Sequence, residues 1–179
     1  MFKIYPLLKY TKIALVISIL NILSGCIKSG YDEVTVYDSN FKSGSTEKLK
    51  GAILYKKQSE FFIGRYNNGG FSVNLDNLAP HKAIEITVET YMHDSWDGNN
   101  NYGGIDGPDV WTMSADGQEL VNSSFSNSPC NSMYCLFQSY PVSYSGGIIN
   151  NPPKTDAMTV LPGFCYTGYT YGTSVYKIV

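Results

Sequence analysis

The sequence has little positive charge. Arg65 is its single arginine, and 13 basic residues face 15 acidic ones, for a formal net charge of −2. Nucleic-acid binding needs a basic patch that neutralises phosphates, and this chain has no run of residues that would supply one. The composition therefore excludes nucleic acid as a partner.

Histidine and catalytic motifs are also scarce. His81 and His93 are the two histidines, and no G-x-S-x-G nucleophile motif occurs. We therefore expect a protein that is not an enzyme. Paired carboxylates such as Asp94 and Asp109 leave a less favoured alternative, an enzyme acting on glycans.

The chain lacks an apolar run of membrane-spanning length. Residues 13–23 are apolar, but a span needs about 20 such residues. Lys3, Lys9 and Lys12 precede this run and Leu23-Ser24-Gly25-Cys26 ends it, which is typical of a signal peptide and resembles a bacterial lipobox. We expect a signal peptide over residues 1–25, a lipid anchor with palmitate at Cys26, and a tether over 26–30.

Two further expectations concern the processed chain. Ile27 follows the cysteine where an aspartate would be the usual inner-membrane retention residue, so the resemblance implies the outer membrane of the bacterial cell envelope. Removing the three leader lysines leaves a net charge of about −5.

No segment after the leader has sustained helical periodicity. Period-two alternation instead predicts strands, of which residues 83–93 form the longest. The Asn67-Asn68-Gly69-Gly70 turn predicts a hairpin between 60–66 and 71–78, and Asp116-Gly117 predicts another between 109–115 and 118–125. We predict an all-β antiparallel sandwich, jelly-roll-like, in a single domain over 31–179. Other expected strands are 31–38, 51–57, 157–161 and 174–179, and residues 126–153 are expected to be long loops.

Cysteines are few. Beyond Cys26 there are Cys130, Cys135 and Cys165. An oxidising envelope favours one disulfide, whose pairing the sequence leaves open. Because there is no C-x-x-C motif or nearby histidine pair, a zinc site is not favoured.

One loop, residues 90–111, is dense in oxygen-bearing side chains. Calcium binds six to eight such oxygens, so the loop predicts a calcium site formed by Asp94, Asp97, Asn99, Asn101, Asp106 and Asp109. An EF-hand is excluded, because Tyr102 and Pro108 stand where glycine and glutamate are needed. The alternative is a loop without an ion, whose carboxylates accept backbone N–H bonds.

Tryptophans flank this loop. Aromatic faces stack on sugar rings while amides bind hydroxyls, so Trp96, Asn99 and Tyr102 are predicted to bind a neutral glycan. For Trp111 we favour a place in the core of the sandwich.

Seven short motifs follow one another across most of the chain. They are F-x-G-R, L-x-x-L-x-x-H, D-S-W-D-G-N, G-P-D-x-W, F-S-N, Q-S-Y-P and G-x-S-V-Y, in residues 62–65, 75–81, 94–99, 107–111, 125–127, 138–141 and 172–176 respectively. Their order resembles a β-sandwich module of secreted and surface-anchored bacterial proteins, of the galactose-binding or lectin-like kind. In that module further strands follow the S-V-Y segment, so we expect a sandwich shortened at its C-terminus.

The resemblance implies ligand binding or adhesion. We expect a surface lipoprotein with a non-enzymatic binding domain, held to the membrane through Cys26 and contacting a glycan or another surface protein. The alternative is a structural envelope module without a small ligand.

Overall fold

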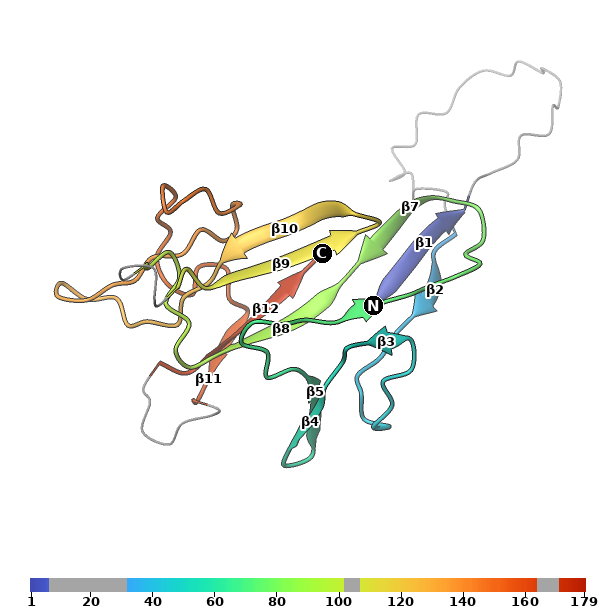
Figure 1. Ribbon diagram of the computed structural model, residues 1–179, viewed down its shortest axis with the longest axis horizontal. Coiled ribbons are helices and arrows are strands. Elements are labelled where there is room, and N and C mark those ends of the chain that lie inside the picture. Colours follow the sequence, from blue (N-terminus) through green and yellow to red (C-terminus); the bar gives the residue numbers. More distant parts are fainter. Residues whose placement is uncertain (7–31, 102–106, 164–170) are drawn as a thin grey trace, which may run out of the picture. The chain divides into compact units, whose positions relative to one another are not determined.

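The computed structural model describes residues 1–6, 32–101, 107–163 and 171–179 (Figure 1). This part of the chain is all-β and antiparallel, as predicted, and holds no helix long and apolar enough to cross a membrane. Its strands are β1 Phe2–Pro6, β2 Val34–Tyr37, β3 Leu49–Lys50, β4 Leu54–Lys57, β5 Glu60–Ile63, β6 Ser72–Val73, β7 His81–Ile86, β8 Val88–His93, β9 Val110–Ala115, β10 Gln118–Ser124, β11 Thr159–Leu161 and β12 Thr173–Ile178.

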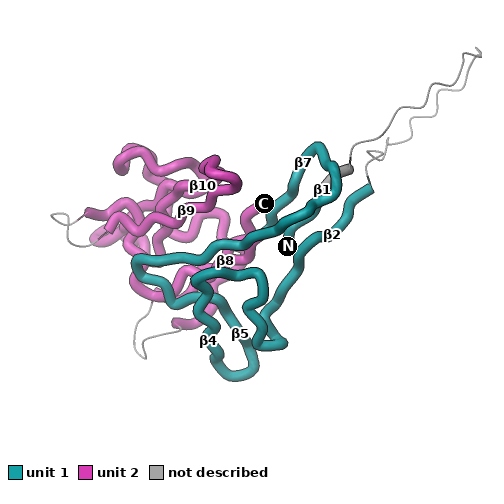
Figure 2. The backbone as a smooth tube through the Cα atoms, turned by 45° about the vertical axis from the view of Figure 1, so that its right-hand side comes forward, with its two compact units in different colours: residues 1–87 teal, residues 88–179 magenta. Residues whose placement is uncertain are grey.

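The contacts divide the chain into two units, Met1–Thr87 and Val88–Val179, called unit 1 and unit 2 below (Figure 2). The boundary falls inside the predicted strand 83–93, so the prediction of one continuous strand was wrong. Its first half, β7, pairs with β1, and its second half, β8, pairs with β12. Apolar and polar residues alternate through Thr87 because each half of the segment has one solvent-exposed face. This alternation carries no information about which strand each half pairs with. The single domain over residues 31–179 stays a prediction.

Strand β1 lies between β2 and β7 in unit 1. The Met1 amino group donates to the Thr87 carbonyl at 2.6 Å, and Lys3 Nζ lies 3.3 Å from Glu33 and 3.5 Å from Glu85 on the two neighbouring strands. Met1, Lys3 and the rest of β1 belong to the predicted signal peptide. If the peptide is removed before Cys26, β1 belongs to the precursor alone, and β2 and β7 lose the strand between them.

The predicted hairpin between residues 60–66 and 71–78 is not formed. Strand β5 pairs with β4 and β6 with β3. Gly64 and Arg65 both have positive φ, 148° and 54°, which ends β5 before the asparagine–glycine turn begins. The Tyr66 hydroxyl then binds Gly51, donating to its carbonyl at 3.1 Å. The chain therefore turns away from residues 71–78, the partner that the local sequence pattern predicted for residues 60–66.

Unit 2 contains two small antiparallel sheets, ordered β11-β12-β8 and β10-β9. The β9–β10 hairpin turns at Asp116-Gly117, both with positive φ, as predicted. Side chains from both sheets meet in one core, so the unit is sandwich-like. The buried members are Met92, Phe125, Tyr176 and Ile178, with Trp96, Trp111, Met113, Val121, Tyr140 and Ala157 packed against them.

Candidate functional site

The described interior of unit 2 is unusually polar. Its buried apolar residues are Met92, Phe125, Val175, Tyr176 and Ile178, whereas its buried polar ones are Thr90, Asp94, Ser123, Ser124, Ser126, Asn127, Ser128, Gln138, Ser139, Thr173 and Ser174. A buried polar group costs free energy unless it is hydrogen-bonded. The partners of these groups therefore show what the interior is built to hold.

Gln138 is the most connected of them. Its Oε1 accepts hydrogen bonds from the Ser126 N–H at 3.1 Å, the Lys154 N–H at 3.0 Å and the Tyr176 hydroxyl at 3.3 Å. Its Nε2 donates to the carbonyls of Tyr140 and Thr155, at 3.3 Å and 3.2 Å. One fully buried amide thus joins β12 to three stretches of loop.

Asn127 connects another set of elements in the same way. Its Nδ2 donates to the Met92 carbonyl on β8 at 2.7 Å, and its Oδ1 accepts from the Ser174 hydroxyl on β12 at 2.5 Å. Its backbone N–H donates to the Trp96 carbonyl at 2.8 Å. The residue therefore joins the start of the loop predicted over residues 90–111, called the acidic loop below, to the β8–β12 pair.

Tyr176 is enclosed by this network and by aromatic rings. Its ring centroid lies 4.8 Å from that of Phe125 and 5.2 Å from that of Tyr140. Burial, the largest cause, raises the pKa of Tyr176 to about 12, and burial also raises the pKa of Tyr140.

The raised pKa of Tyr176 predicts an alkaline transition of unit 2. An unfolded tyrosine ionises near pH 10, so between about pH 10 and about pH 12 the folded state holds the proton more tightly. The free energy of unfolding should be unaffected below about pH 10 and fall by about 2–3 kcal/mol through this window. Denaturant melts across this range test it. The Tyr176→Phe variant should show a smaller fall, and an equal fall would contradict the assignment.

The acidic loop folds back on itself between its described ends. The Asp97 N–H donates to Asp109 Oδ2, and the Asp109 N–H donates to the Gly98 carbonyl at 2.9 Å. Asp94, 2% exposed and with φ of 54°, donates its N–H to the Gly172 carbonyl at 2.9 Å. The structure thus brings Asp97 and Asp109 together and buries Asp94 at the end of β8.

Asn99 was predicted both as a calcium ligand and as a glycan ligand. Its Oδ1 accepts from the Ser124 hydroxyl at 2.5 Å, and its Nδ2 donates to the Ile149 carbonyl at 2.5 Å and to Asn150 Oδ1 at 3.3 Å. The backbone N–H donates to the Phe137 carbonyl at 2.7 Å. The side chain therefore joins two segments of unit 2, at Ser124 and at residues 149–150, and the backbone N–H joins a third at Phe137.

Trp96 packs partly buried against the core. Its ring meets Phe125 edge-on, with centroids 6.3 Å apart. Trp111 also packs against this cluster, as predicted. Trp96 therefore contributes to the packing of unit 2 in addition to any contact it makes with a ligand.

Several predicted site residues lie outside the described part of the chain, namely Cys26, Tyr102, Asp106 and Cys165. Asp94, Asp97, Asn101 and Asp109 all have interaction partners. Among the described residues, no group of three or more His, Cys, Asp or Glu side chains could hold a metal ion. That search does not include Asp106, so the calcium site stays a prediction.

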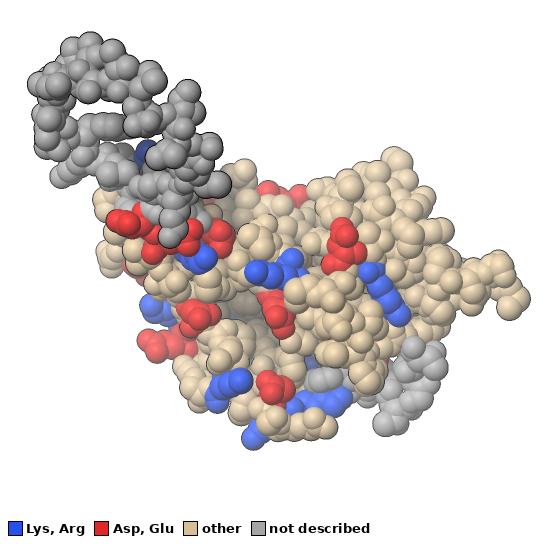
Figure 3. All heavy atoms as spheres, turned by 180° about the vertical axis from the view of Figure 1, so that it is seen from behind, with Lys and Arg blue, Asp and Glu red and all other residues tan. Residues whose placement is uncertain are grey.

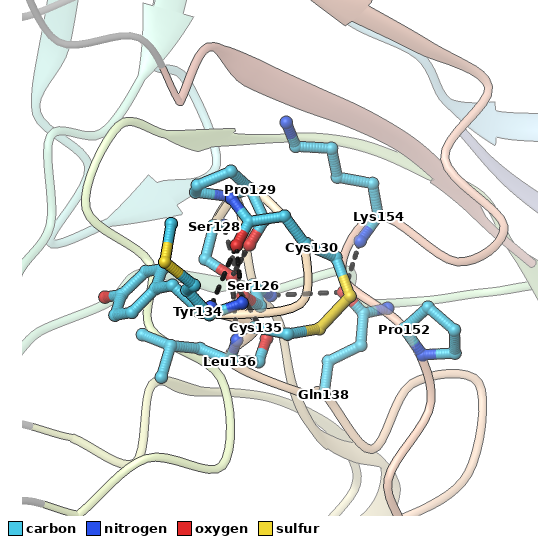
Figure 4. The surroundings of a disulfide bond; sticks show 12 residues. Ser126, Ser128, Pro129, Cys130, Tyr134, Cys135, Leu136, Gln138, Pro152 and Lys154 are labelled. Carbon is cyan, nitrogen blue, oxygen red and sulfur yellow. Dashed lines mark hydrogen bonds between the residues drawn. A yellow bond between two sulfur atoms is a disulfide. The ribbon is translucent and has the colours of Figure 1, made fainter.

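The structure pairs Cys130 with Cys135 (Figure 4). Ser128, just before the disulfide-closed loop, accepts the Leu136 N–H at 2.9 Å through its hydroxyl. The pairing that the sequence left open is therefore the short one, which closes a surface loop.

Gln138 and Asn127 were not singled out as functional by the sequence analysis. Both lie in its short motifs, Asn127 in F-S-N and Gln138 in Q-S-Y-P. The motifs could have indicated them, since polar residues flanked by core aromatics are typical of buried hydrogen-bonding positions.

No known protein family, curated protein or solved structure matches the chain.

Proposed function

We propose that this chain is a lipid-anchored protein of the bacterial outer membrane whose unit 2 is a non-enzymatic binding module. The observation that carries the proposal is the polar network in which the buried Gln138 and Asn127 and the half-buried Asn99 fix long loops to a small β scaffold. Binding residues are commonly placed on loops positioned by a rigid scaffold. Loops held by buried amides keep their shape before a ligand arrives, which lowers the entropy cost of binding.

The leader features of the sequence support the anchor. Diacylglycerol and palmitate on Cys26 would supply the two or more chains that stable membrane attachment requires. Growth with an alkyne-labelled palmitate tests this: the wild-type chain should be labelled and sediment with membranes, and Cys26→Ala should be unlabelled and soluble. A labelled Cys26→Ala chain would remove the anchor from the proposal.

Calcium-dependent glycan binding is the second candidate for unit 2. The hydrogen bond from the Asp97 N–H to Asp109 Oδ2 favours it, because it brings Asp109 back to the start of the loop, beside the backbone of Asp97. Asp97, Asn101 and Asp109 would hold the ion together with Asp106, and Trp96 would stack its ring face on a neutral sugar.

A melt and a glycan array test this candidate in order. Calcium that binds the folded state raises the melting temperature by mass action, and the rise should disappear in Asp97→Ala but persist in Asp116→Ala, which changes a hairpin turn. Trp96→Phe, which preserves an aromatic core contact, should then lose array binding. A melting temperature that calcium does not change would contradict this candidate and leave the acidic loop with a structural role only.

A further inference from the structure

The longest stretch of unit 2 without a named strand, residues 125–158, is free of charge as far as residue 153. Residues 120–153 contain no Asp, Glu, Lys, Arg or His. The exposed loops within this run therefore carry neither red nor blue side chains in Figure 3. A surface of this kind neither attracts nor repels charged partners, so it selects a partner by shape and apolar contact.

The disulfide-closed loop in this run contributes almost nothing to the core. Met133, at its tip, is 92% exposed, and the loop extends away from the strands of unit 2 (Figure 1). The Cα atoms of Cys130 and Cys135 lie 4.1 Å apart, so the four residues between them are not needed to span a distance. Folding alone therefore gives no reason for a large apolar side chain at this tip.

The same loop is nevertheless held in one shape. Asn131 Oδ1 accepts the N–H groups of Met133 and Tyr134, both at 2.9 Å, and the Asn131 N–H donates to the Tyr134 carbonyl at 3.0 Å. The disulfide also restricts the conformations open to this short loop in the unfolded chain. Figure 4 shows the loop rising from Ser128 and Leu136, which join its two ends.

Other exposed apolar side chains lie on segments that the network ties together. Phe137 is 39% exposed and Ile148 is 77% exposed. Gln138 and Asn151 exchange backbone hydrogen bonds at 2.9 Å, and Asn99 binds both the Phe137 and Ile149 carbonyls. Phe137 and Ile148 therefore lie on neighbouring segments, and Asn99 of the acidic loop is hydrogen-bonded to both segments.

We propose that Met133, on its disulfide-closed loop, is an anchor residue that docks into an uncharged apolar pocket of a partner protein, with Phe137 and Ile148 on the same interface. Methionine and aromatic residues are enriched in the centres of protein interfaces, where charges are depleted. Tyr, Ser, Gly and Asn, which make up most of the remaining loop residues, are the composition of antibody binding loops. A lipid surface fits less well, because Asn131 and Ser132 beside the methionine would lose their hydration.

This inference rests on the proposed binding function, and its test is separable from the glycan and palmitate tests. The intact anchored protein is expressed in its own cells with a photocrosslinking amino acid in place of Met133. The matched control places it at Met158, which is 53% exposed and lies outside the charge-free run. We expect a discrete protein adduct from position 133 and none from position 158.

The partner protein identified in the adduct is then purified in its free form, and its affinity for the anchored protein is measured directly. Met133→Asp should weaken binding at least about tenfold, Met158→Asp should leave it unchanged, and affinity should hold from about 0.05 M to about 0.5 M salt. Adducts with lipid alone would assign the tip to a membrane surface and overturn the proposal. Equal adducts from both positions, or none, would also overturn it. A protein adduct together with a negative glycan array would remove the glycan and leave protein docking in place.

Discussion

Replacing Gln138 with methionine is expected to unfold unit 2 under mild conditions. Methionine has a similar length and volume but no polar atom. It leaves the Ser126 N–H, the Lys154 N–H and the Tyr176 hydroxyl without their buried acceptor. Each unsatisfied buried group costs about 1–3 kcal/mol, so with three such groups the variant should lose about 3–9 kcal/mol of its free energy of unfolding. Whole domains are stable by only about 5–15 kcal/mol.

Thermal and urea melts measure this loss. For a unit of this size we expect the melting temperature to fall by at least about 15 °C. Gln118→Met is the matched control, because Gln118 is exposed on β10 and the same substitution there removes no buried bond. If Gln138→Met and Gln118→Met have the same melting temperature, the network does not stabilise unit 2 as described.

Gly98→Ala is expected to have the second large effect. Gly98 has φ of +67°, and a Cβ atom there would lie 2.1 Å from the Phe137 carbonyl oxygen and 2.9 Å from Ser126 Cβ. Backbone atoms must then move, and the bond from the Asn99 N–H to that carbonyl would be lost. We expect about 3–5 kcal/mol of destabilisation, the sum of left-handed strain and displaced backbone.

Gly146 provides a control with the same backbone conformation. Its φ is +68°, but a Cβ there would meet nothing within 4 Å. Gly146→Ala should therefore cost only the conformational strain, about 1–2 kcal/mol. Comparable losses in the two variants would show that the close packing of the acidic loop against residue 137 is not what Gly98 serves.

Local patterns in the sequence predicted the β class well. Alternation and an Asp-Gly turn were enough for β9 and β10, because a two-residue hairpin is determined by neighbours in sequence. The pattern failed at residues 83–93 and 60–78, where the chain changes partner at Thr87 and turns away after Gly64 and Arg65. Those outcomes depend on distant strands that a period of two does not identify.

The candidate site was less predictable for a related reason. The acidic loop was correctly recognised as a dense set of side-chain oxygens, but the sequence does not say which of them face protein donors. Asn99 finds Ser124 25 residues away, and Gln138 finds Tyr176 38 residues away. Serine, asparagine and glutamine have no burial period of their own, so their place in the interior becomes visible only with the fold.

Native-state amide exchange tests the central claim that buried amides hold the loops of unit 2 rigid. The N–H groups of Ser126, Leu136 and Lys154 lie outside any named strand and bind buried side-chain oxygens. They should exchange as slowly as the amides shared by β8 and β12, and much more slowly than those of Gly146 and Gly147. Exchange at the rate of Gly146 would contradict the account, because it would mean that these loops open freely and that the polar interior does not fix them.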